Sequence, residues 1–274
     1  MKQNKLRLAI LDMNNGTPNQ GMRCLREIAD RYKDQLDWDE FDVRQKNELP
    51  DLSYDLYISS GGPGSPLDGD TWKKNFFNLI DAAWIHNQQE DSSKKHFFFI
   101  CHSFQLACEH FNLGTITKRK STSFGVYPIH KNKAGRKEPL FDGLSDPYYA
   151  VDSRDWQLIQ PKLKVFAEHG AKVLSLEKIR THVEYERAIM AVRFSPEFIG
   201  TQFHPEADAQ GMKTHFEKTE NREKVIKNFG IERYDDMMLM LEDPNKIELT
   251  HSIILPNFIE SSIQKLQEQE LAVL

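Results

Sequence analysis

The chain has 274 residues, of which 39% are hydrophobic and 28% are charged, and its formal net charge is −5. This length allows one substantial core, or one core with a smaller appendage. The acidic balance gives no basic footprint for nucleic acid and no polybasic patch for a membrane surface. No apolar run approaches the roughly 20 residues that span a bilayer. We therefore predict a soluble globular protein without a nucleic-acid or membrane partner.

The cysteine content indicates the compartment. There are three cysteines, an odd number without paired spacing, which argues against a disulfide framework and for a reducing environment. We predict a cytoplasmic protein. Cys108 lies near His96, His102 and His110, but no CxxC or HxxxH spacing joins them. We therefore predict no metal site and no cofactor.

The first half of the chain alternates between strand and helix patterns. Apolar runs predict strands over residues 6–11, 38–43 and 54–59, and apolar residues recur at helical spacing over 22–32 and 72–84. Alternation of this kind predicts an α/β fold with an open, mostly parallel sheet and helices on both faces.

The second half changes in character. Between positions 114 and 203 we predict short β-type segments over 123–130, 164–168, 172–176, 188–194 and 198–203. Beyond position 207 we predict helices over 213–229, 234–242 and 247–269. These patterns divide the chain into a domain of residues 1–208 and a C-terminal helical extension of residues 209–274. We favour packing of the extension onto the domain, and an interface with a partner or with a second copy in a homodimer stays open.

A cysteine stands at the junction of a predicted strand and helix. Phe97 to Ile100 form an unbroken apolar run, typical of a strand buried on both faces. After Cys101 the apolar residues recur at helical spacing. A strand that turns directly into a helix holds the junction residue on a sharp, exposed corner, as in the nucleophile elbow of hydrolases. Cys101 is therefore a candidate nucleophile, and the alternative is a small buried hydrophobic residue.

Two further motifs carry candidate chemistry. The loop from Gly61 to Gly64 follows a predicted buried strand, at the sheet edge where open α/β folds place their sites. It indicates either half of an oxyanion hole or simply a tight turn. His204 and Glu206 are two positions apart in an extended segment, so their side chains project to the same side. A histidine oriented by a carboxylate can take a proton from a thiol and return it to a leaving amine. Alone, this pair is also compatible with an ordinary surface contact.

The three motifs in this order resemble the class I (triad-type) glutamine amidotransferase family. That family includes the glutaminase parts of GMP synthetase, anthranilate synthase and carbamoyl phosphate synthetase. The resemblance covers roughly residues 5–208 and implies a flavodoxin-like sheet. It also implies that Cys101 attacks the side-chain amide of glutamine and forms a γ-glutamyl thioester. His204 would then be the general base and acid, and Glu206 its orienting partner.

The resemblance assigns further residues to the site. The amides of Gly62 and His102 would form the oxyanion hole, and Gln105 matches a glutamine that contacts the substrate. Asp152 and Ser153 begin a stretch that falls where the family has a loop gripping the α-amino and carboxylate groups of the substrate. This stretch departs from the family's usual Ser-His pattern.

The elbow itself also departs from the family pattern. The usual elbow is Gly-x-Cys-x-Gly, whereas this chain has Phe99 and Ser103 at the glycine positions. Serine is a mild change. We expect the bulk of Phe99 to require a shifted backbone or an adapted neighbour.

Three functions are compatible with this sequence. The first is a glutamine amidotransferase that passes ammonia to an acceptor enzyme on a separate synthase chain. The second is a γ-glutamyl peptide hydrolase that uses the same acyl-enzyme. The third is a non-catalytic binding or scaffold protein that retains the fold. The segment after Glu206 has no nucleotide-binding glycine pattern, so we expect no ATP-using domain in this chain.

Overall fold

The structure, a computed structural model, describes residues 5–69, 71–90, 92–179 and 186–273. The strands are β1 (Leu6–Asp12), β2 (Leu36–Asp42), β3 (Leu56–Ser59), β4 (His96–Ile100), β5 (Thr115–Lys131), β6 (Tyr148–Ile159), β7 (Lys172–Glu177), β8 (Ile189–Arg193) and β9 (Phe198–Thr201). The helices are α1 (Gln20–Asp30), α2 (Thr71–Asn87), α3 (His102–His110), α4 (Leu163–His169), α5 (Ala209–Glu217), α6 (Thr219–Phe229), α7 (Ile231–Glu242) and α8 (Ile247–Val273).

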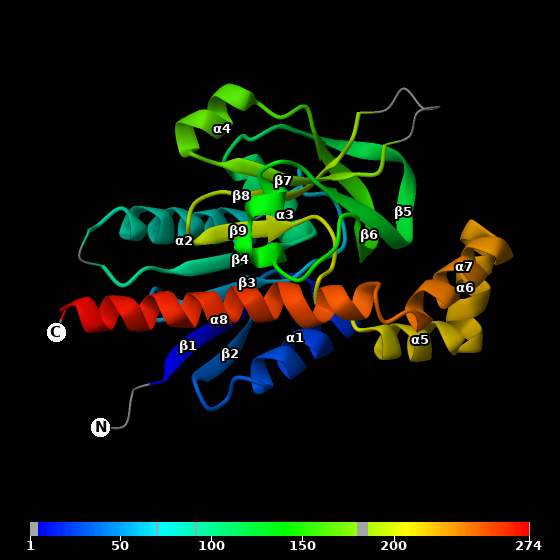
Figure 1. Cartoon of the computed structure of the whole chain (residues 1–274), viewed down its shortest axis with the longest axis horizontal. Helices are drawn as coiled ribbons and strands as arrows, with labels where there is room; N and C mark the ends of the chain where they lie inside the picture. The colour runs from blue at the N-terminus through cyan, green and yellow to red at the C-terminus, as the bar shows by residue number, and fades with distance from the viewer. Residues whose placement is uncertain (1–4, 70, 91, 180–185, 274) are drawn as a thin grey trace.

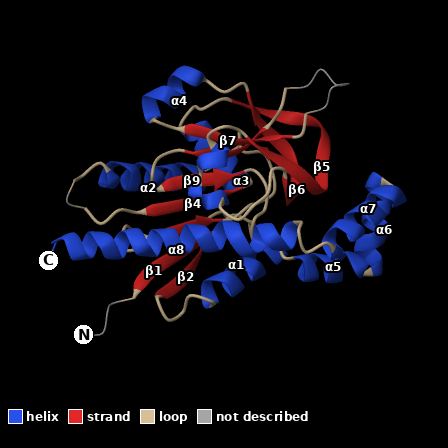
Figure 2. Cartoon of the chain, viewed as in Figure 1, coloured by secondary structure: helices blue, strands red, loops and turns tan. Residues whose placement is uncertain are grey.

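The described strands form one open sheet in the order β2-β1-β3-β4-β9-β8-β7-β5-β6 (Figure 1). Strands β2, β1, β3, β4 and β9 pair in parallel, and the pairs from β9 to β6 are antiparallel. In Figure 2 the strands lie between helices on both sides. The predicted fold, an open α/β sheet covered on both faces and followed by a helical extension, is confirmed.

Two apolar cores explain why helices cover both faces. On one face, Met22 and Leu25 of α1 and Phe258 of α8 pack with β-strand residues such as Phe98. On the other face, the aromatic side chains of α2, α3 and α4 pack with alternate residues of the same strands. Because successive side chains of a strand point to opposite faces, β4 must be apolar throughout to serve both cores.

The C-terminal helices make two kinds of contact with the sheet. Helix α8 crosses one face of the sheet, starting beside α7 (Figure 1). Its residues Ile254, Leu255 and Ile259 are fully buried in the core that α1 also covers. Helices α5, α6 and α7 form a smaller cluster around Val126 of β5 and Val151 of β6. The domain boundary drawn at residue 208 stays a prediction.

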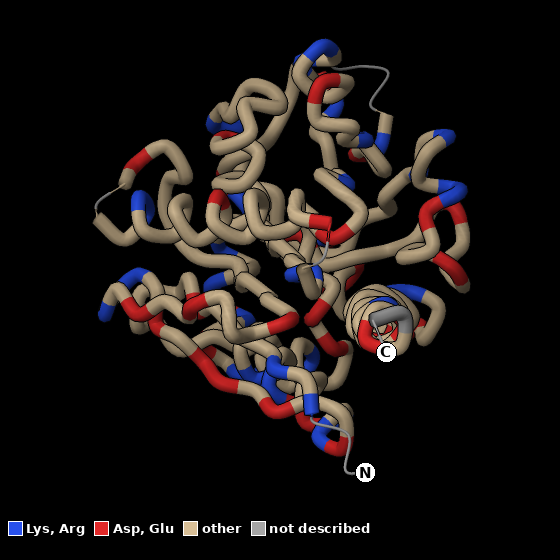
Figure 3. The backbone as a smooth tube through the Cα atoms, turned by 90° about the vertical axis from the view of Figure 1, so that its left-hand side faces the viewer, with Lys and Arg blue, Asp and Glu red and all other residues tan. Residues whose placement is uncertain are grey.

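The surface carries both signs of charge. Along the backbone drawn in Figure 3, Lys and Arg positions are interspersed with Asp and Glu positions. Within the described residues, no helix is both long enough and apolar enough to cross a membrane.

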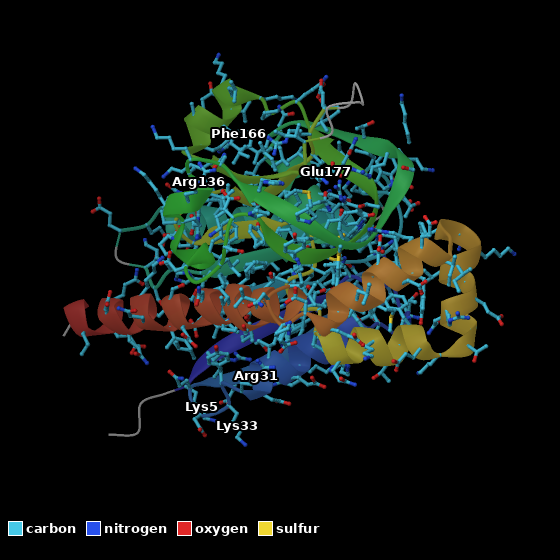
Figure 4. The ribbon with its side chains drawn as sticks, turned by 45° about the vertical axis from the view of Figure 1, so that its right-hand side comes forward. Lys5, Arg31, Lys33, Arg136, Phe166 and Glu177 are labelled. Atoms are coloured by element: carbon cyan, nitrogen blue, oxygen red, sulfur yellow. The ribbon has the colours of Figure 1, made fainter. Side chains whose placement is uncertain are left out.

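One predicted strand is wrong. Residues 164–168 belong to helix α4, which begins at Leu163 and ends where Gly170 adopts a left-handed φ of 66°. The helix is short and buries only Phe166, labelled on α4 in Figure 4. Two helical turns with one buried side chain give no readable period, because three or four apolar positions are needed to separate helix from strand.

The predicted helix over 213–229 is in fact two helices. Lys218 is extended, with φ −61° and ψ 127°, and separates α5 from α6. Phe216 and Val225 nevertheless reach the same apolar cluster. The break was not visible in the sequence because no glycine or proline marks it.

The resemblance implied a loop at the stretch that begins with Asp152, but the structure has a strand there. The stretch lies inside β6, a strand that the sequence analysis did not predict. Asp152 accepts hydrogen bonds from Arg154 Nε at 2.9 Å and from Ser123 Oγ at 2.7 Å. Both charged side chains are buried, 1% and 5% exposed, so their mutual pairing lets a charged segment enter the sheet.

Candidate active site

The parallel pairing of β4 and β9 brings the two main sequence motifs together. Ile100 lies opposite Thr201 in the register, and the Cys101 amide donates to the Thr201 carbonyl at 2.8 Å. The chain therefore leaves both strands at the same carboxyl edge of the sheet. This edge is where open α/β sheets place their sites.

Cys101 occupies a strained elbow between β4 and α3. Its φ is 49° and its ψ is −98°, a conformation that non-glycine residues rarely adopt. Strain of this kind clusters at functional sites. The side chain is only 5% exposed, so the expected exposed corner is in fact nearly closed. The Ser153 carbonyl, 3.8 Å from the Cys101 sulfur, contributes to this cover.

A glycine on the neighbouring strand accommodates Phe99. Phe99 lies opposite Gly200 of β9, and a Cβ atom at Gly200 would lie 3.0 Å from the Phe99 Cβ and 2.9 Å from its carbonyl oxygen. Gly200, on the partner strand, thus leaves the space that Phe99 needs at the elbow position where the family has a glycine. Ser103, at the other departure, accepts from the Ile100 amide at 2.8 Å and donates to the Ser59 carbonyl at 2.8 Å.

His204 and Glu206 form a close pair beside the thiol. The Nδ1 atom of His204 lies 2.7 Å from Oε1 of Glu206, and the His204 amide donates to the Val151 carbonyl at 2.9 Å. The Cys101 side chain lies beside the same imidazole, since a Cβ atom added at Gly61 would meet both side chains. Because Glu206 occupies Nδ1, the nitrogen left for the sulfur is Nε2. The structure therefore brings Cys101, His204 and Glu206 together at this edge of the sheet.

The electrostatics of this group favour a charged imidazole. Burial by itself lowers the pKa of His204, but the Glu206 carboxylate and the Cys101 side chain outweigh it and raise that pKa well above 6.5. Glu206 is 2% exposed, and its Oε2 atom has no hydrogen-bond partner among the described residues. A Cβ atom at Gly21 of α1 would lie 2.9 Å from Oε1, so glycine makes room for the carboxylate.

Gly61 marks the meeting point of the thiol and the imidazole. A Cβ atom there would lie 2.7 Å from Cε1 of His204 and 3.4 Å from Cβ of Cys101. Both side chains therefore press against this one glycine. From the sequence, Gly61 was assigned to the glycine loop without a role of its own. The available signal was its position just after Ser60, at the end of β3.

Residues outside the glycine motif hold the loop that carries Gly62 in place. A Cβ atom at Gly62 would lie 2.2 Å from the Met13 carbonyl oxygen, a distance that only glycine permits. Arg44 donates to the carbonyls of Met13 at 3.2 Å and of Pro63 at 2.5 Å. Arg44 was missed by the sequence analysis, because nothing near it in the chain resembles a motif.

The two amides predicted to form the oxyanion hole belong to the residue after Cys101 and to the residue after Gly61. His102 begins α3, where a backbone N–H has no partner within the helix. Gly62 follows Gly61, which contacts Cys101. In the described part of the chain, neither amide has a hydrogen-bond acceptor. The His102 side chain is 1% exposed, and burial, with Arg44 and Lys73 nearby, lowers its pKa to about 3, so its ring is neutral.

Gln105 contacts another glutamine behind the thiol. Its Nε2 donates to the Trp156 carbonyl at 3.1 Å and to Oε1 of Gln202 at 3.0 Å. This contact fixes the orientation of the Gln202 amide, whose Nε2 then donates to the Cys101 sulfur at 3.7 Å. Gln202 is fully buried and was not singled out from the sequence. The sequence feature that could have identified Gln202 is its position in the segment just before His204.

The remaining two predicted substrate residues lie in different settings. Asp152 faces the interior, where its oxygens are occupied by Arg154 and Ser123. Ser153 has an exposed side chain, and its carbonyl lies beside Cys101. The structure therefore brings the backbone of Ser153, and not the Asp152 carboxylate, to the site. Over the described ranges, no group of three or more His, Cys, Asp or Glu side chains is placed to hold a metal ion.

Comparison with known families gives one match. The model of the family "Glutamine amidotransferase class-I" matches residues 10–223. No sequence among curated proteins matches the chain significantly.

Several solved structures share the fold. A glutamine amidotransferase from Thermotoga maritima aligns with a TM-score of 0.70 and 16% identity, over 95% of this chain and 99% of that one. A protein from Thermoplasma acidophilum, assigned as one of the subunits of a GMP synthase, aligns with a TM-score of 0.59 and 16% identity. The alignment covers 98% of this chain and 99% of that one. The glutaminase domain of the Trypanosoma brucei CTP synthase, solved with acivicin, has a TM-score of 0.53 and 13% identity, over 76% and 89%. At these identities the likeness concerns the fold.

Proposed function

Since this chain belongs to the class I glutamine amidotransferase family, we propose that it hydrolyses the side-chain amide of glutamine through a covalent Cys101 intermediate. The observation that carries this proposal is the placement of Cys101, at a strained elbow, beside an imidazole that pairs with the Glu206 carboxylate. A thiol, an imidazole and an orienting carboxylate in hydrogen-bond reach are the parts that nucleophilic acyl transfer needs.

In the first step, the Cys101 sulfur attacks the side-chain carbonyl carbon of glutamine. His204, which as the charged imidazole already holds the thiol proton, passes it to the departing nitrogen, so ammonia leaves and a γ-glutamyl thioester remains. In the second step, water attacks the thioester carbon and gives a proton to His204. Glutamate then leaves, and the thiolate and the charged imidazole are restored.

The negative oxygen that forms in both steps requires donors. The amides of Gly62 and His102 are available for this role, and each such donor is commonly worth about 3–4 kcal/mol of transition-state stabilisation. Gln202 adds a hydrogen bond to the sulfur itself. Because Cys101 is only 5% exposed, its sulfur is accessible to a small group such as the side-chain amide of glutamine.

The ammonia requires an acceptor, and we propose a separate synthase chain. Two proteins of this fold support the proposal. One is assigned as a subunit of a GMP synthase, and the other is the glutaminase domain of a CTP synthase. A γ-glutamyl peptide would pass through the same acyl-enzyme, and differs only in its leaving amine. A scaffold protein without activity is the remaining alternative.

One assay separates these functions. Purified protein is given glutamine or a γ-glutamyl peptide, and ammonia and free glutamate are measured. Release of both products from glutamine supports the proposal, whereas glutamate from the peptide alone supports the hydrolase. Cys101→Ser should lose at least a thousandfold in turnover and keep its unfolding midpoint. Cys24→Ser is the matched control, because a hydroxyl can replace the Cys24 thiol as the donor to Asp208 at 3.0 Å. Full turnover by Cys101→Ser, or no turnover by the wild type on either substrate, would exclude this mechanism.

A further inference from the structure

His251 lies near the start of the C-terminal helix α8, far from the motifs in sequence but next to Glu206 in space. Its Nδ1 atom lies 2.9 Å from the backbone carbonyl oxygen of Glu206. Its Nε2 atom lies 3.1 Å from a guanidinium nitrogen of Arg31. Arg31 directly follows α1 and is labelled below α8 in Figure 4. The imidazole is 4% exposed and its contact with Glu206 is buried, whereas Arg31 reaches it from the surface.

The two partners of His251 fix which ring nitrogen carries the proton. A carbonyl oxygen can only accept, so Nδ1 must donate to Glu206. A guanidinium can only donate, so Nε2 must accept from Arg31. His251 therefore links the start of α8, the end of α1 and the backbone of Glu206 in one defined arrangement.

The Glu206 carboxylate depends on this backbone contact. Its Oε1 atom contacts His204 at 2.7 Å, and its Oε2 atom has no hydrogen-bond partner among the described side chains and backbone groups. The side chain therefore provides no second hydrogen bond that would hold the carboxylate in place. Its position follows from where the main chain of Glu206 lies, and His251 holds that main chain.

From this geometry we propose that His251 is a positioning residue for the active site. Through the Glu206 carbonyl it sets the carboxylate that orients His204, which makes the C-terminal helix α8 part of the support of the catalytic group. The inference rests on the proposed function for its role in turnover, but the contacts on which it depends involve only this chain.

The structure offers matched variants for a test. His251→Ala removes the donor, and His251→Asn keeps an N–H near the place of Nδ1. Thr250→Val is the control, because Thr250 also ties this turn of α8 to the sheet, through its hydroxyl and the Tyr149 carbonyl at 2.6 Å. It does so without touching Glu206.

The first readout is steady-state glutaminase activity. We expect kcat of His251→Ala to fall roughly tenfold with KM changed less than about twofold, because one hydrogen bond that orients the base is lost and substrate contacts are kept. His251→Asn should recover most of kcat. Thr250→Val should keep kcat even where it lowers the unfolding midpoint. Equal losses in Thr250→Val and His251→Ala, or an unchanged kcat in His251→Ala, would overturn the inference.

The second readout does not require turnover. Iodoacetamide alkylates Cys101 at a rate that depends on its imidazole partner, and peptide-resolved mass spectrometry separates this site from Cys24 and Cys108. Across a pH series, His251→Ala should alkylate Cys101 several-fold more slowly than the wild type and Thr250→Val. If the wild type shows no glutaminase activity but this difference appears, the proposed function fails and the positioning role stands. If the wild type turns over glutamine and the alkylation profiles coincide, the positioning role fails instead.

Discussion

At the scale of single residues, the Cys101 sulfur is surrounded by groups that come from distant parts of the chain. His204 and Gln202 reach it from the segment after β9, and the Ser153 carbonyl reaches it from β6. Each contact has a distinct physical effect. The imidazole can move a proton, the amide of Gln202 can only stabilise negative charge on the sulfur, and the carbonyl can only accept.

Gln202 gives the first prediction. Gln202→Leu removes the amide donor and keeps a similar volume, so Cys101 should react with iodoacetamide about tenfold more slowly at neutral pH, since a hydrogen bond to a charged group is worth about 1.5–3 kcal/mol. Gln105→Leu keeps the Gln202 amide but removes the hydrogen bond that orients it. This variant should therefore slow the alkylation of Cys101 less than Gln202→Leu does. Alkylation rates measured by mass spectrometry test both variants. A larger loss in Gln105→Leu than in Gln202→Leu would contradict this ordering.

The raised pKa of His204 gives the second prediction. A histidine whose pKa is higher in the folded than in the unfolded chain stabilises the fold fully below the unfolded value, near 6.5, and loses this effect as the pH rises through the folded value. The wild type should therefore exceed His204→Gln in free energy of unfolding by more at pH 6 than at pH 9. Urea titrations at the two pH values measure this difference, in which the other titrating groups largely cancel. A difference that stays constant, or grows with pH, would contradict the charged pair with Glu206.

At the scale of elements, the parallel register of β4 and β9 does most to build the site. It sets Cys101 beside Thr201, and the next few residues then deliver His204 to the same edge. The all-apolar run of β4 made this strand and its helix predictable from the sequence. The meeting of Cys101 and His204 was implied only by the resemblance, because no local pattern encodes that β4 and β9 become neighbours.

The elements that were missed have specific physical reasons. Strand β6, at the edge of the sheet, contains Asp152 and Arg154, and this buried charged pair gives the strand the composition of a loop. Helix α4 is too short to show a period. Gly61 and Gly200 take their roles from side chains that approach them in space. Sequence patterns report local preferences, and all of these features depend on contacts between distant segments.

At the scale of the whole molecule, α8 joins the sheet core and the active-site edge. Phe258 is 3% exposed and packs edge-on against Phe98 of β4, with ring centroids 5.2 Å apart. Near its start, His251 contacts Glu206. The C-terminal helix is thus continuous with the same core that carries the strand before Cys101.

This continuity gives the third prediction. Phe258→Ala should lower the free energy of unfolding by about 3–5 kcal/mol, the usual cost of emptying a buried aromatic site. Gln264→Ala, an exposed substitution on the same helix, should change it by less than about 0.5 kcal/mol. Urea or thermal unfolding followed by circular dichroism measures both. A single transition is expected in each case, and loss of α8 in a separate, earlier transition would show that the helix folds independently of the sheet.

The central claim is that Cys101 forms a covalent bond with the glutamyl group. The most direct measurement is intact-protein and peptide mass spectrometry after incubation with a diazo-ketone analogue of glutamine, with Cys101→Ser and His204→Gln in parallel. We predict a single adduct on Cys101 in the wild type, no adduct in Cys101→Ser, a much slower reaction in His204→Gln, and protection of the wild type by excess glutamine. An unmodified Cys101, or an adduct on Cys24 or Cys108 that glutamine does not prevent, would contradict the claim.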